Sequence, residues 1–165
     1  MIEKEVLLLL GGNEGDPLSL SDAVERSIGN GIGRILARSR DHWTEPWGFE
    51  DARLFLNRAL LLGTILDPEV LMMKLLDIER QFGRIRKAGS TYGPRPIDID
   101  ILLIGDLVFR SELLEVPHPR MQQRAFALAP AADIAPRWVH PVRKQTVLQL
   151  LNGCKGSLDR CDVYS

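Results

Sequence analysis

Four predicted strands and two predicted helices between residues 6 and 104 follow one another in the order strand, helix, strand, strand, helix, strand. This order is typical of a ferredoxin-like α+β sandwich, in which one antiparallel sheet carries helices on one face. The strands are expected at 6–10, 32–43, 55–66 and 97–104, each bounded by turn-forming residues. We therefore predict a single domain over residues 1–165, with a C-terminal extension added to the ferredoxin-like core.

The expected helices have recognisable start and stop signals. Asp67-Pro68-Glu69 supplies a capping residue, a proline at the first helical position and an acid near the positive end of the helix dipole. Gly83 ends this helix. The other elements are expected as a helix at 19–28 ended by Gly29-Asn30-Gly31, a turn at 105–106 followed by a short partner strand at 107–109, a helix at 121–128 and a last helix beginning at Thr146.

The charge balance and the cysteines narrow the possible partners. The 21 basic and 22 acidic residues give a net charge of −1, whereas nucleic-acid binders usually carry a basic excess. No apolar run approaches the length of a membrane span. Cys154 and Cys161 are too few for a disulfide framework, and their spacing matches no zinc site. We expect a monomeric cytoplasmic protein with reduced thiols that binds neither nucleic acid nor membranes.

Two aspartates stand at the start of the last predicted strand, in Asp98-Ile99-Asp100. Residues i and i+2 of a strand point to the same face, so the two carboxylates lie side by side and repel each other. A cation between them would remove this repulsion, and hard oxygen ligands suit Mg²⁺, which also binds water and substrate phosphate. The alternative is a pair of solvated surface acids at the start of a strand.

The loop before these aspartates is basic. No acid occurs from residue 80 to residue 97, while five basic residues do: Arg80, Arg84, Arg86, Lys87 and Arg95. Arginine pairs bidentately with phosphate, so a basic loop leading to two carboxylates suits phosphoryl transfer. A merely solvated charged loop is the competing interpretation.

Single polar and aromatic residues supply further candidates. Asn57 lies in an apolar strand on the face shared by Phe55, where it either bonds within its own fold or binds the edge of a flat heterocycle. Phe55 and Phe126 either stack on such a ring or belong to the core. His118 is held between Pro117 and Pro119, and it either contacts phosphate or is polar surface.

Several motifs along nearly the whole chain resemble those of one family. They are Leu10-Gly11-Gly12-Asn13, Phe55-Leu56-Asn57, Gly83-Arg84-Ile85-Arg86, Gly93-Pro94-Arg95-Pro96-Ile97-Asp98-Ile99-Asp100, Val116-Pro117-His118-Pro119-Arg120 and Asp133-Ile134-Ala135-Pro136. The family is 6-hydroxymethyl-7,8-dihydropterin pyrophosphokinase, an enzyme of folate biosynthesis. The resemblance implies Mg²⁺-dependent transfer of the terminal two phosphates of ATP to the pterin hydroxymethyl group, with release of AMP.

The resemblance also implies roles for individual residues. Two Mg²⁺ ions would be held by Asp98 and Asp100, which with Arg84 and Arg95 form the catalytic set. The residues implied to bind ATP are Glu79, Arg84, Arg86, Arg95, Ile101, His118 and Arg124. Those implied to bind the pterin are Asn13, Thr44, Pro46, Trp47, Phe55, Asn57, Asp98 and Phe126. Thr91, Tyr92, Leu113 and Glu115 depart from the pattern of many members.

Two other functional classes remain open at this stage. Ferredoxin-like sheets also bind RNA on strand aromatics, although strand aromatics are sparse here. A sensor domain that binds a nucleotide without chemistry would share the phosphate and ring sites. The Asp98–Asp100 pair discriminates among the three, because only the pyrophosphokinase needs metal ions at that position.

Overall fold

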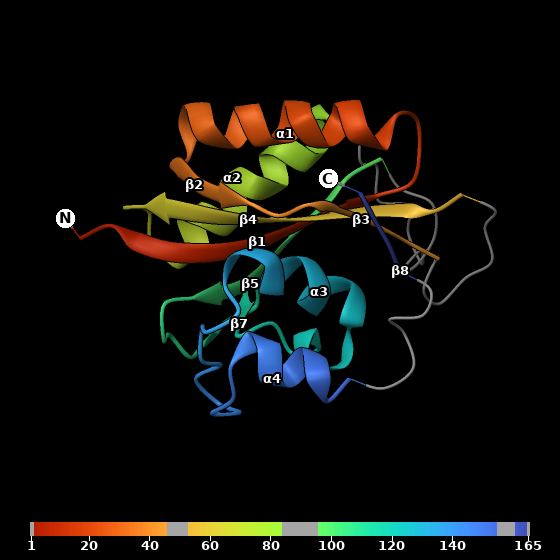
Figure 1. The fold of residues 1–165 in the computed structure, drawn as a ribbon. Helices are drawn as coiled ribbons and strands as arrows, with labels where there is room; N and C mark the ends of the chain where they lie inside the picture. The colour runs from red at the N-terminus through yellow and green to blue at the C-terminus, as the bar shows by residue number, and fades with distance from the viewer. Residues whose placement is uncertain (1, 46–52, 84–95, 155–160, 165) are drawn as a thin grey trace.

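The computed structural model describes residues 2–45, 53–83 and 96–154, and residues 161–164 by their backbone alone. Within these residues the chain forms a six-stranded sheet, and Figure 1 shows α1 and α2 on one face and α3 and α4 on the other. The elements are β1 (Lys4–Gly12), α1 (Pro17–Gly31), β2 (Arg34–Arg38), β3 (Asp41–Thr44), β4 (Phe55–Thr64), α2 (Pro68–Gln81), β5 (Asp98–Ile104), β6 (Phe109–Arg110), β7 (Glu115–Val116), the 3-10 helix η1 (Met121–Gln123), α3 (Ala125–Ile134), α4 (Val147–Asn152) and β8 (Cys161–Tyr164).

The strand order is β5-β1-β4-β3-β8, with β2 also paired to β4, and all these pairs are antiparallel. Strand β4 therefore lies between β1 and the β2/β3 pair, and β1 lies between β4 and β5. Two split β-α-β units interlock in this way, which is the ferredoxin-like arrangement. The predicted antiparallel α+β sheet is confirmed, and α3 and α4 of the C-terminal extension cover the face that α1 and α2 leave open.

Each face of the sheet has its own hydrophobic core. The core under α1 and α2 includes Val6, Leu8 and Leu10 of β1, Val24 and Ile28 of α1, Leu71, Leu75 and Ile78 of α2, and Ile99 and Ile101 of β5. The core under α3 and α4 includes Leu7, Leu9, Leu102, Met121, Ala127, Leu128, Ala131, Val147 and Leu150. Small alanines let α3 approach the sheet closely, and this helix forms one wall of the site described below.

The predicted strand at 32–43 is wrong in one respect, because the structure divides it into β2 and β3. The interruption lies at Ser39, whose Oγ accepts a hydrogen bond from the backbone N–H of Ala59 (2.8 Å) and donates to the carbonyl of Arg40 (2.7 Å). A side chain thus takes the place of a backbone partner, and the chain bends. Both pieces remain paired with β4.

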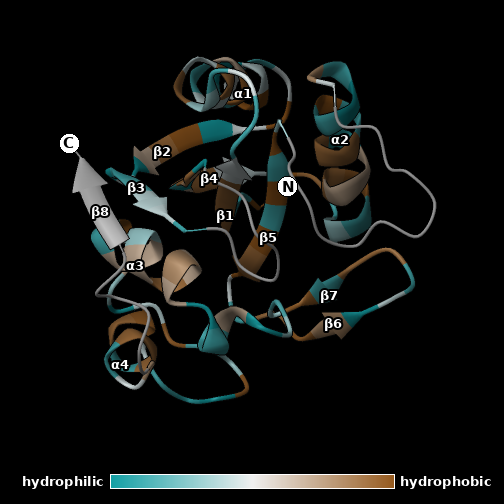
Figure 2. Cartoon of the chain, turned by 90° about the vertical axis from the view of Figure 1, so that its right-hand side faces the viewer, coloured by the Kyte–Doolittle hydropathy of each residue, from teal (hydrophilic) through white to brown (hydrophobic). Residues whose placement is uncertain are grey.

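Other boundaries also differ from the sequence-based expectations. Helix α1 begins at Pro17, because the Asp16 carboxylate accepts from the backbone and hydroxyl of Ser19, and it continues to Gly31. The expected partner strand after β5 is instead β6, which pairs with β7 in a separate hairpin beside β5 (Figure 2). The helix expected at 121–128 is η1 followed by α3, whereas α4 begins after Thr146 as predicted. No helix in the described part of the chain is long and apolar enough to cross a membrane.

Candidate active site

Four strands place one residue each in a single row across the sheet. His42 of β3 pairs with Asn57 of β4, Asn57 pairs with Gly11 of β1, and Gly11 pairs with Asp98 of β5. Directly paired residues point to the same face, and a hydrogen bond from His42 to helix α3 shows that this is the α3 face. Because Gly11 has no side chain, the row contains a gap between Asn57 and Asp98.

Asn57 is fixed by its neighbours on β3. Its Nδ2 donates to the hydroxyl of Thr44 (2.8 Å) and to the carbonyl of His42 (3.2 Å), and its side chain is buried. The Oδ1 atom faces the gap, since it would lie 3.7 Å from a Cβ built on Gly11. The fold therefore orients the amide, and the amide oxygen is presented toward the gap.

Asp98 and Asp100 share the face of β5 that turns toward α3, as the sequence predicts, while Ile99 and Ile101 are buried on the opposite face. Strand β5 is an edge of the sheet, and Glu79 of α2 covers that edge. The buried Glu79 carboxylate accepts a hydrogen bond from the backbone N–H of Ile99 at 2.6 Å. Helix α2 therefore holds the strand at the residue between the two aspartates.

His118 and Arg124 lie on the same side of the sheet as Asp98 and Asp100. The backbone N–H of His118 donates to the carbonyl of Leu102 (2.9 Å), and its Nδ1 accepts from the N–H of Arg120 (3.1 Å). Burial and, next in size, the Arg124 charge together lower the pKa of His118 to about 4, while the Asp98 charge opposes this shift. The ring is neutral at pH 7 and carries its proton on Nε2, which makes that nitrogen a hydrogen-bond donor.

The two candidate aromatic residues come from facing elements. Phe55 begins β4 on the face of Asn57, and Phe126 lies in the first turn of α3, partly buried against its core. The Arg124 guanidinium lies 5.5 Å from the centre of the Phe126 ring. Asn13 is buried just beyond the end of β1. Carboxylates, a cation, an oriented amide and aromatic rings thus gather on one face of the sheet.

Residues 7–136 match the family described as 7,8-dihydro-6-hydroxymethylpterin-pyrophosphokinase. The match covers most of the chain, from β1 to the end of α3. The chain belongs to this family. Its members are pyrophosphokinases of folate synthesis, so the predicted family and enzyme class are confirmed.

Similar proteins agree with this assignment. The chain is 45% identical over 138 residues to the 2-amino-4-hydroxy-6-hydroxymethyldihydropteridine pyrophosphokinase of Porphyromonas gingivalis, covering 82% of this chain and 93% of that protein. It is 39% identical over 141 residues to the enzyme of the same name from Aquifex aeolicus, covering 85% and 86%.

A solved structure shows the same fold. The wild-type HPPK-DHPS protein of Plasmodium falciparum superposes with a TM-score of 0.72 at 15% identity, covering 92% of this chain. The chain spans 44% of the length of that protein.

One expected ATP-binding residue, Ile101, points away from the site, and two departures from the family pattern lie in the β6–β7 hairpin. The Ile101 side chain lies in the core under α1 and α2, on the opposite side of β5 from the aspartates. Glu115 lies in β7, where Oε1 is 3.3 Å from Nε of Arg110. Leu113 lies two residues before it, between β6 and β7. The expected site residues Pro46, Trp47, Arg84, Arg86 and Arg95 lie outside the described part of the chain, and so do the departures Thr91 and Tyr92.

Two residues near the site, Gly11 and His42, were not predicted from the sequence. Gly11 was visible in a family motif, but its place between Asn57 and Asp98 depends on strand register. His42 is buried, and its Nε2 lies 2.8 Å from Oδ2 of Asp133 in α3. Asp133 also belongs to a family motif. The only hint of a role for His42 in the sequence was that two polar residues, Asp41 and His42, stand near an apolar strand.

The donor set suits magnesium. The described residues contain no group of three or more His, Cys, Asp or Glu side chains able to hold a metal ion by themselves. Mg²⁺ usually takes one or two carboxylates and completes its shell with water and substrate phosphate. The same-face pair Asp98 and Asp100 fits this requirement.

Proposed function

We propose that the α3 face of the sheet catalyses transfer of a pyrophosphoryl group from ATP to 6-hydroxymethyl-7,8-dihydropterin. The pterin hydroxyl oxygen would attack the β-phosphorus of ATP and the bond to the α-phosphate oxygen would break. AMP would leave, and the hydroxyl proton would pass to solvent. The observation that carries this proposal is the gap over Gly11, which has an oriented amide on one side and the paired carboxylates on the other.

The pterin would occupy this gap. Asn57 Oδ1 would accept a hydrogen bond from the edge of the ring, while Phe55 and Phe126 would stack on its faces. Thr44 acts through Asn57, because its hydroxyl holds the amide nitrogen. Asn13, which is buried just beyond the end of β1, is proposed as a further contact, and so are Pro46 and Trp47.

Asp98 and Asp100 would hold Mg²⁺, and we propose two ions, as the family resemblance implies. Bound Mg²⁺ would neutralise phosphate charge and orient the transferred group. The protein's contribution is to keep the two carboxylates on one face at a fixed spacing. Glu79 contributes by bonding the backbone between them.

Basic residues would bind the phosphates that the metal leaves exposed. We propose Arg84, Arg86, Arg95 and Arg124 for this role, with His118 as a neutral donor through Nε2–H. Ile101 would take part through its backbone at the edge of β5. A loose phosphoryl-transfer transition state depends mainly on positioning and charge neutralisation, so the site needs no dedicated general base.

The assembly and location of the protein follow from the same proposal. We propose that residues 1–165 act as one pterin pyrophosphokinase domain, as a monomer in the cytoplasm. The substrates are small molecules, and each candidate residue comes from this one chain.

The deciding experiment measures AMP release from ATP with and without the pterin, at fixed Mg²⁺ and again with EDTA. AMP should appear only when both pterin and Mg²⁺ are present. Asp98→Asn and Asp100→Asn should each slow AMP release by about 100-fold or more, as loss of a main electrostatic group does. Asp106→Asn, which removes an exposed carboxylate from the turn after β5, is the matched control and should keep the rate. Near-normal rates in both site variants would contradict the assignment.

A further inference from the structure

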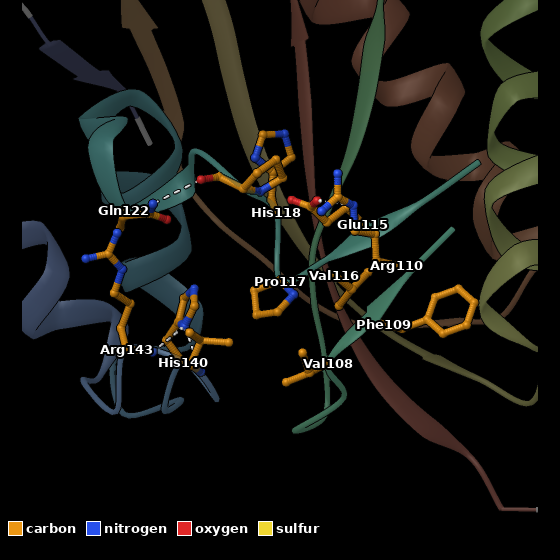
Figure 3. Close-up of a pocket in the computed structure, with 12 residues that line it drawn as sticks. Val108, Phe109, Arg110, Glu115, Val116, Pro117, His118, Gln122, His140 and Arg143 are labelled. Carbon is orange, nitrogen blue, oxygen red and sulfur yellow. Dashed lines mark hydrogen bonds and ion pairs between the residues drawn. The ribbon is translucent and has the colours of Figure 1, made fainter. Parts of the chain in front are cut away.

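A pocket of about 520 Å³ lies between the β6–β7 hairpin and the turn that precedes α4 (Figure 3). We call it the hairpin pocket. Val108 and Val116 line it on the hairpin side, and His140, Val142 and Arg143 line it on the side of the turn. Its volume falls within the range of about 300–1,000 Å³ that is usual for small-molecule sites. Of its lining residues, the proposed reaction uses His118 alone.

His140 presents an N–H group in this pocket. The residue is only 4% exposed, and its Nδ1 accepts hydrogen bonds from the backbone N–H groups of Val142 (3.2 Å) and Arg143 (3.0 Å). Burial and the neighbouring Arg143 charge lower the pKa of His140. The ring is therefore neutral at pH 7, and its single proton sits on Nε2.

The Nε2–H group has no hydrogen-bond partner among the residues that the structure describes. It is also not one of the fully enclosed side-chain atoms that lack a partner in this part of the chain, so it keeps some exposed surface, and His140 lines the pocket. Figure 3 shows the ring standing up from its turn, with the bonded nitrogen toward Arg143 and the other nitrogen pointing away from the turn. This donor can therefore bond an acceptor that enters the pocket.

The charges around the pocket favour an anion. Arg110 and Glu115 neutralise each other at 3.3 Å, whereas no carboxylate of the described residues pairs with Arg143. The pocket therefore carries one net positive charge next to the free Nε2–H of His140. Together, Arg143 and His140 can bind one oxyanion.

The remaining surface favours an apolar body on that anion. Val108 is 62% exposed and Val142 is 58% exposed, and they line the pocket from opposite sides. Pro117 adds a further apolar surface to the lining of the pocket. A ligand with an oxyanion group and a short apolar body would cover these apolar side chains and also accept a hydrogen bond from the Nε2–H of His140.

We propose that the hairpin pocket is an accessory binding site for a small organic anion, with its oxyanion group at His140 and Arg143. The site is separate from the gap over Gly11. Of its lining residues only His118 belongs to the proposed active site, and the proposal does not depend on the proposed reaction.

The test is an NMR titration of the full ¹⁵N-labelled chain at constant ionic strength. The probes are sodium butyrate, methyl phosphate and, as the neutral analogue of butyrate, butyramide. The reporters are the backbone amides of Val142 and Arg143. Saturable shifts with butyrate or methyl phosphate, and binding of butyramide about tenfold weaker than that of butyrate, are expected. The tighter of the two anions identifies the ligand as a carboxylate or a phosphate ester, and absence of saturable shifts with both anions overturns the proposal.

Matched variants check the location. Arg143→Gln and Val142→Asp should weaken binding about fivefold or more, because the first removes the attracting charge and the second adds a repelling one. Arg26→Gln, which removes an exposed charge from α1 on the other face of the sheet, and Val142→Asn should bind normally. His140→Asn keeps an acceptor for the turn but removes the Nε2–H, so it should fold and bind weakly. Equal binding by all five variants overturns the proposal.

A competition experiment separates this pocket from the nucleotide site. The butyrate titration is repeated with Mg²⁺ and a saturating, non-hydrolysable ATP analogue. Butyrate should bind with the same affinity as before. Displacement of butyrate by the analogue would show that the pocket is part of the nucleotide site and would overturn the proposal. AMP release by the Arg143→Gln enzyme should remain normal, and this readout reports on the reaction independently.

Discussion

Nε2 of His42 lies 2.8 Å from Oδ2 of Asp133, and this contact joins strand β3 to helix α3. The carbonyl of His42 also accepts a hydrogen bond from Asn57, while α3 carries Phe126. Two walls of the proposed pterin pocket are therefore connected through one part-buried pair. Arg40 braces the same carboxylate from the surface, with two side-chain hydrogen bonds to Asp133 (2.9 and 3.2 Å).

Removing the Asp133 charge should loosen this connection. Asp133→Asn is expected to lower the free energy of unfolding by about 1–3 kcal/mol, the usual cost of a disrupted buried hydrogen bond to a charged group. The KM for the pterin should rise more than the KM for ATP, because the affected walls hold the pterin. Thermal unfolding and both KM values are the measurements. Arg40→Gln leaves the His42 contact in place and should show a smaller change in both.

The same pair should weaken in acid. Burial opposes ionisation of Asp133, but the hydrogen bonds from Arg40 and His42 outweigh it and lower the pKa below the ordinary 3.8. Its stabilising contribution is therefore complete above pH 3.8 and is lost as the pH falls through the folded-state pKa. In Asp133→Asn this part of the acid unfolding curve should be missing.

Glu79 should influence the rate through the backbone of β5. Glu79→Leu leaves the Ile99 N–H without its acceptor, and we expect a loss of about 1–3 kcal/mol of stability together with a lower kcat. Glu79→Gln keeps a carbonyl oxygen at the same position and should restore most of both. Measured kcat and urea unfolding of the two variants give the answer. If Glu79→Leu and Glu79→Gln lose kcat equally, the carboxylate charge matters and the positioning role is incorrect.

Gly11→Ala should impair the site but not the fold. A Cβ at this position would meet its nearest neighbour, Asn57 Oδ1, at 3.7 Å, which is an ordinary contact. The methyl group would, however, enter the gap proposed for the pterin. We expect a raised KM for the pterin with an almost unchanged melting temperature.

Gly33→Ala is the contrasting control for that experiment. Its Cβ would lie 2.3 Å from the carbonyl oxygen of Gly63, so the backbone must shift and stability must fall. Gly33 precedes β2, away from the gap, so the KM for the pterin should stay the same in molecules that remain folded. An unchanged pterin KM in Gly11→Ala would place the pterin elsewhere.

His118 should make the stability of the free protein depend on pH. The unfolded histidine takes up its proton near pH 6.5, whereas the folded one does so only near pH 4. Between these values the unfolded state binds more protons, so the free energy of unfolding falls as the pH is lowered. At 1.36 kcal/mol per pKa unit, the loss reaches about 3 kcal/mol. Urea unfolding at pH 7 and pH 4.5 should show most of this loss in the wild type and a smaller loss in His118→Gln.

Local sequence patterns predicted the features that depend on neighbouring residues. The same-face placement of Asp98 and Asp100 follows from the two-residue period of a strand, and so does that of Phe55 and Asn57. The start of α2 at Pro68 follows from the proline at the first helical position, whereas Asp67 before it makes no capping hydrogen bond through its side chain. The start of α4 follows from Thr146, which forms a capping box with Gln149. These predictions needed no knowledge of which strands are neighbours.

Features that depend on long-range register were not predicted. The alignment of Asn57, Gly11 and Asp98 joins residues from three distant strands, and no local pattern encodes it. Arg58 is another example, since it is 2% exposed in the middle of β4 and is neutralised by Asp41 and Asp22 at 2.7 and 2.8 Å. A cation in an apolar strand signals a buried network, but its partners are known only from the fold. The roles of Arg84 and Arg95 stay predictions.

The run from Val6 to Leu10 has a consequence for how faithfully the protein reaches its active form. Both faces of this strand are apolar, so a slip of one residue against β4 and β5 would still bury large side chains on each side. Such a slip would move Leu10 into the place of Gly11 and fill the gap between Asn57 and Asp98. The hydrophobic core thus discriminates only weakly between the correct register of β1 and a register shifted by one residue. A refolded preparation could contain compact, stable and inactive molecules, and the fraction that is active would report the fidelity of strand alignment.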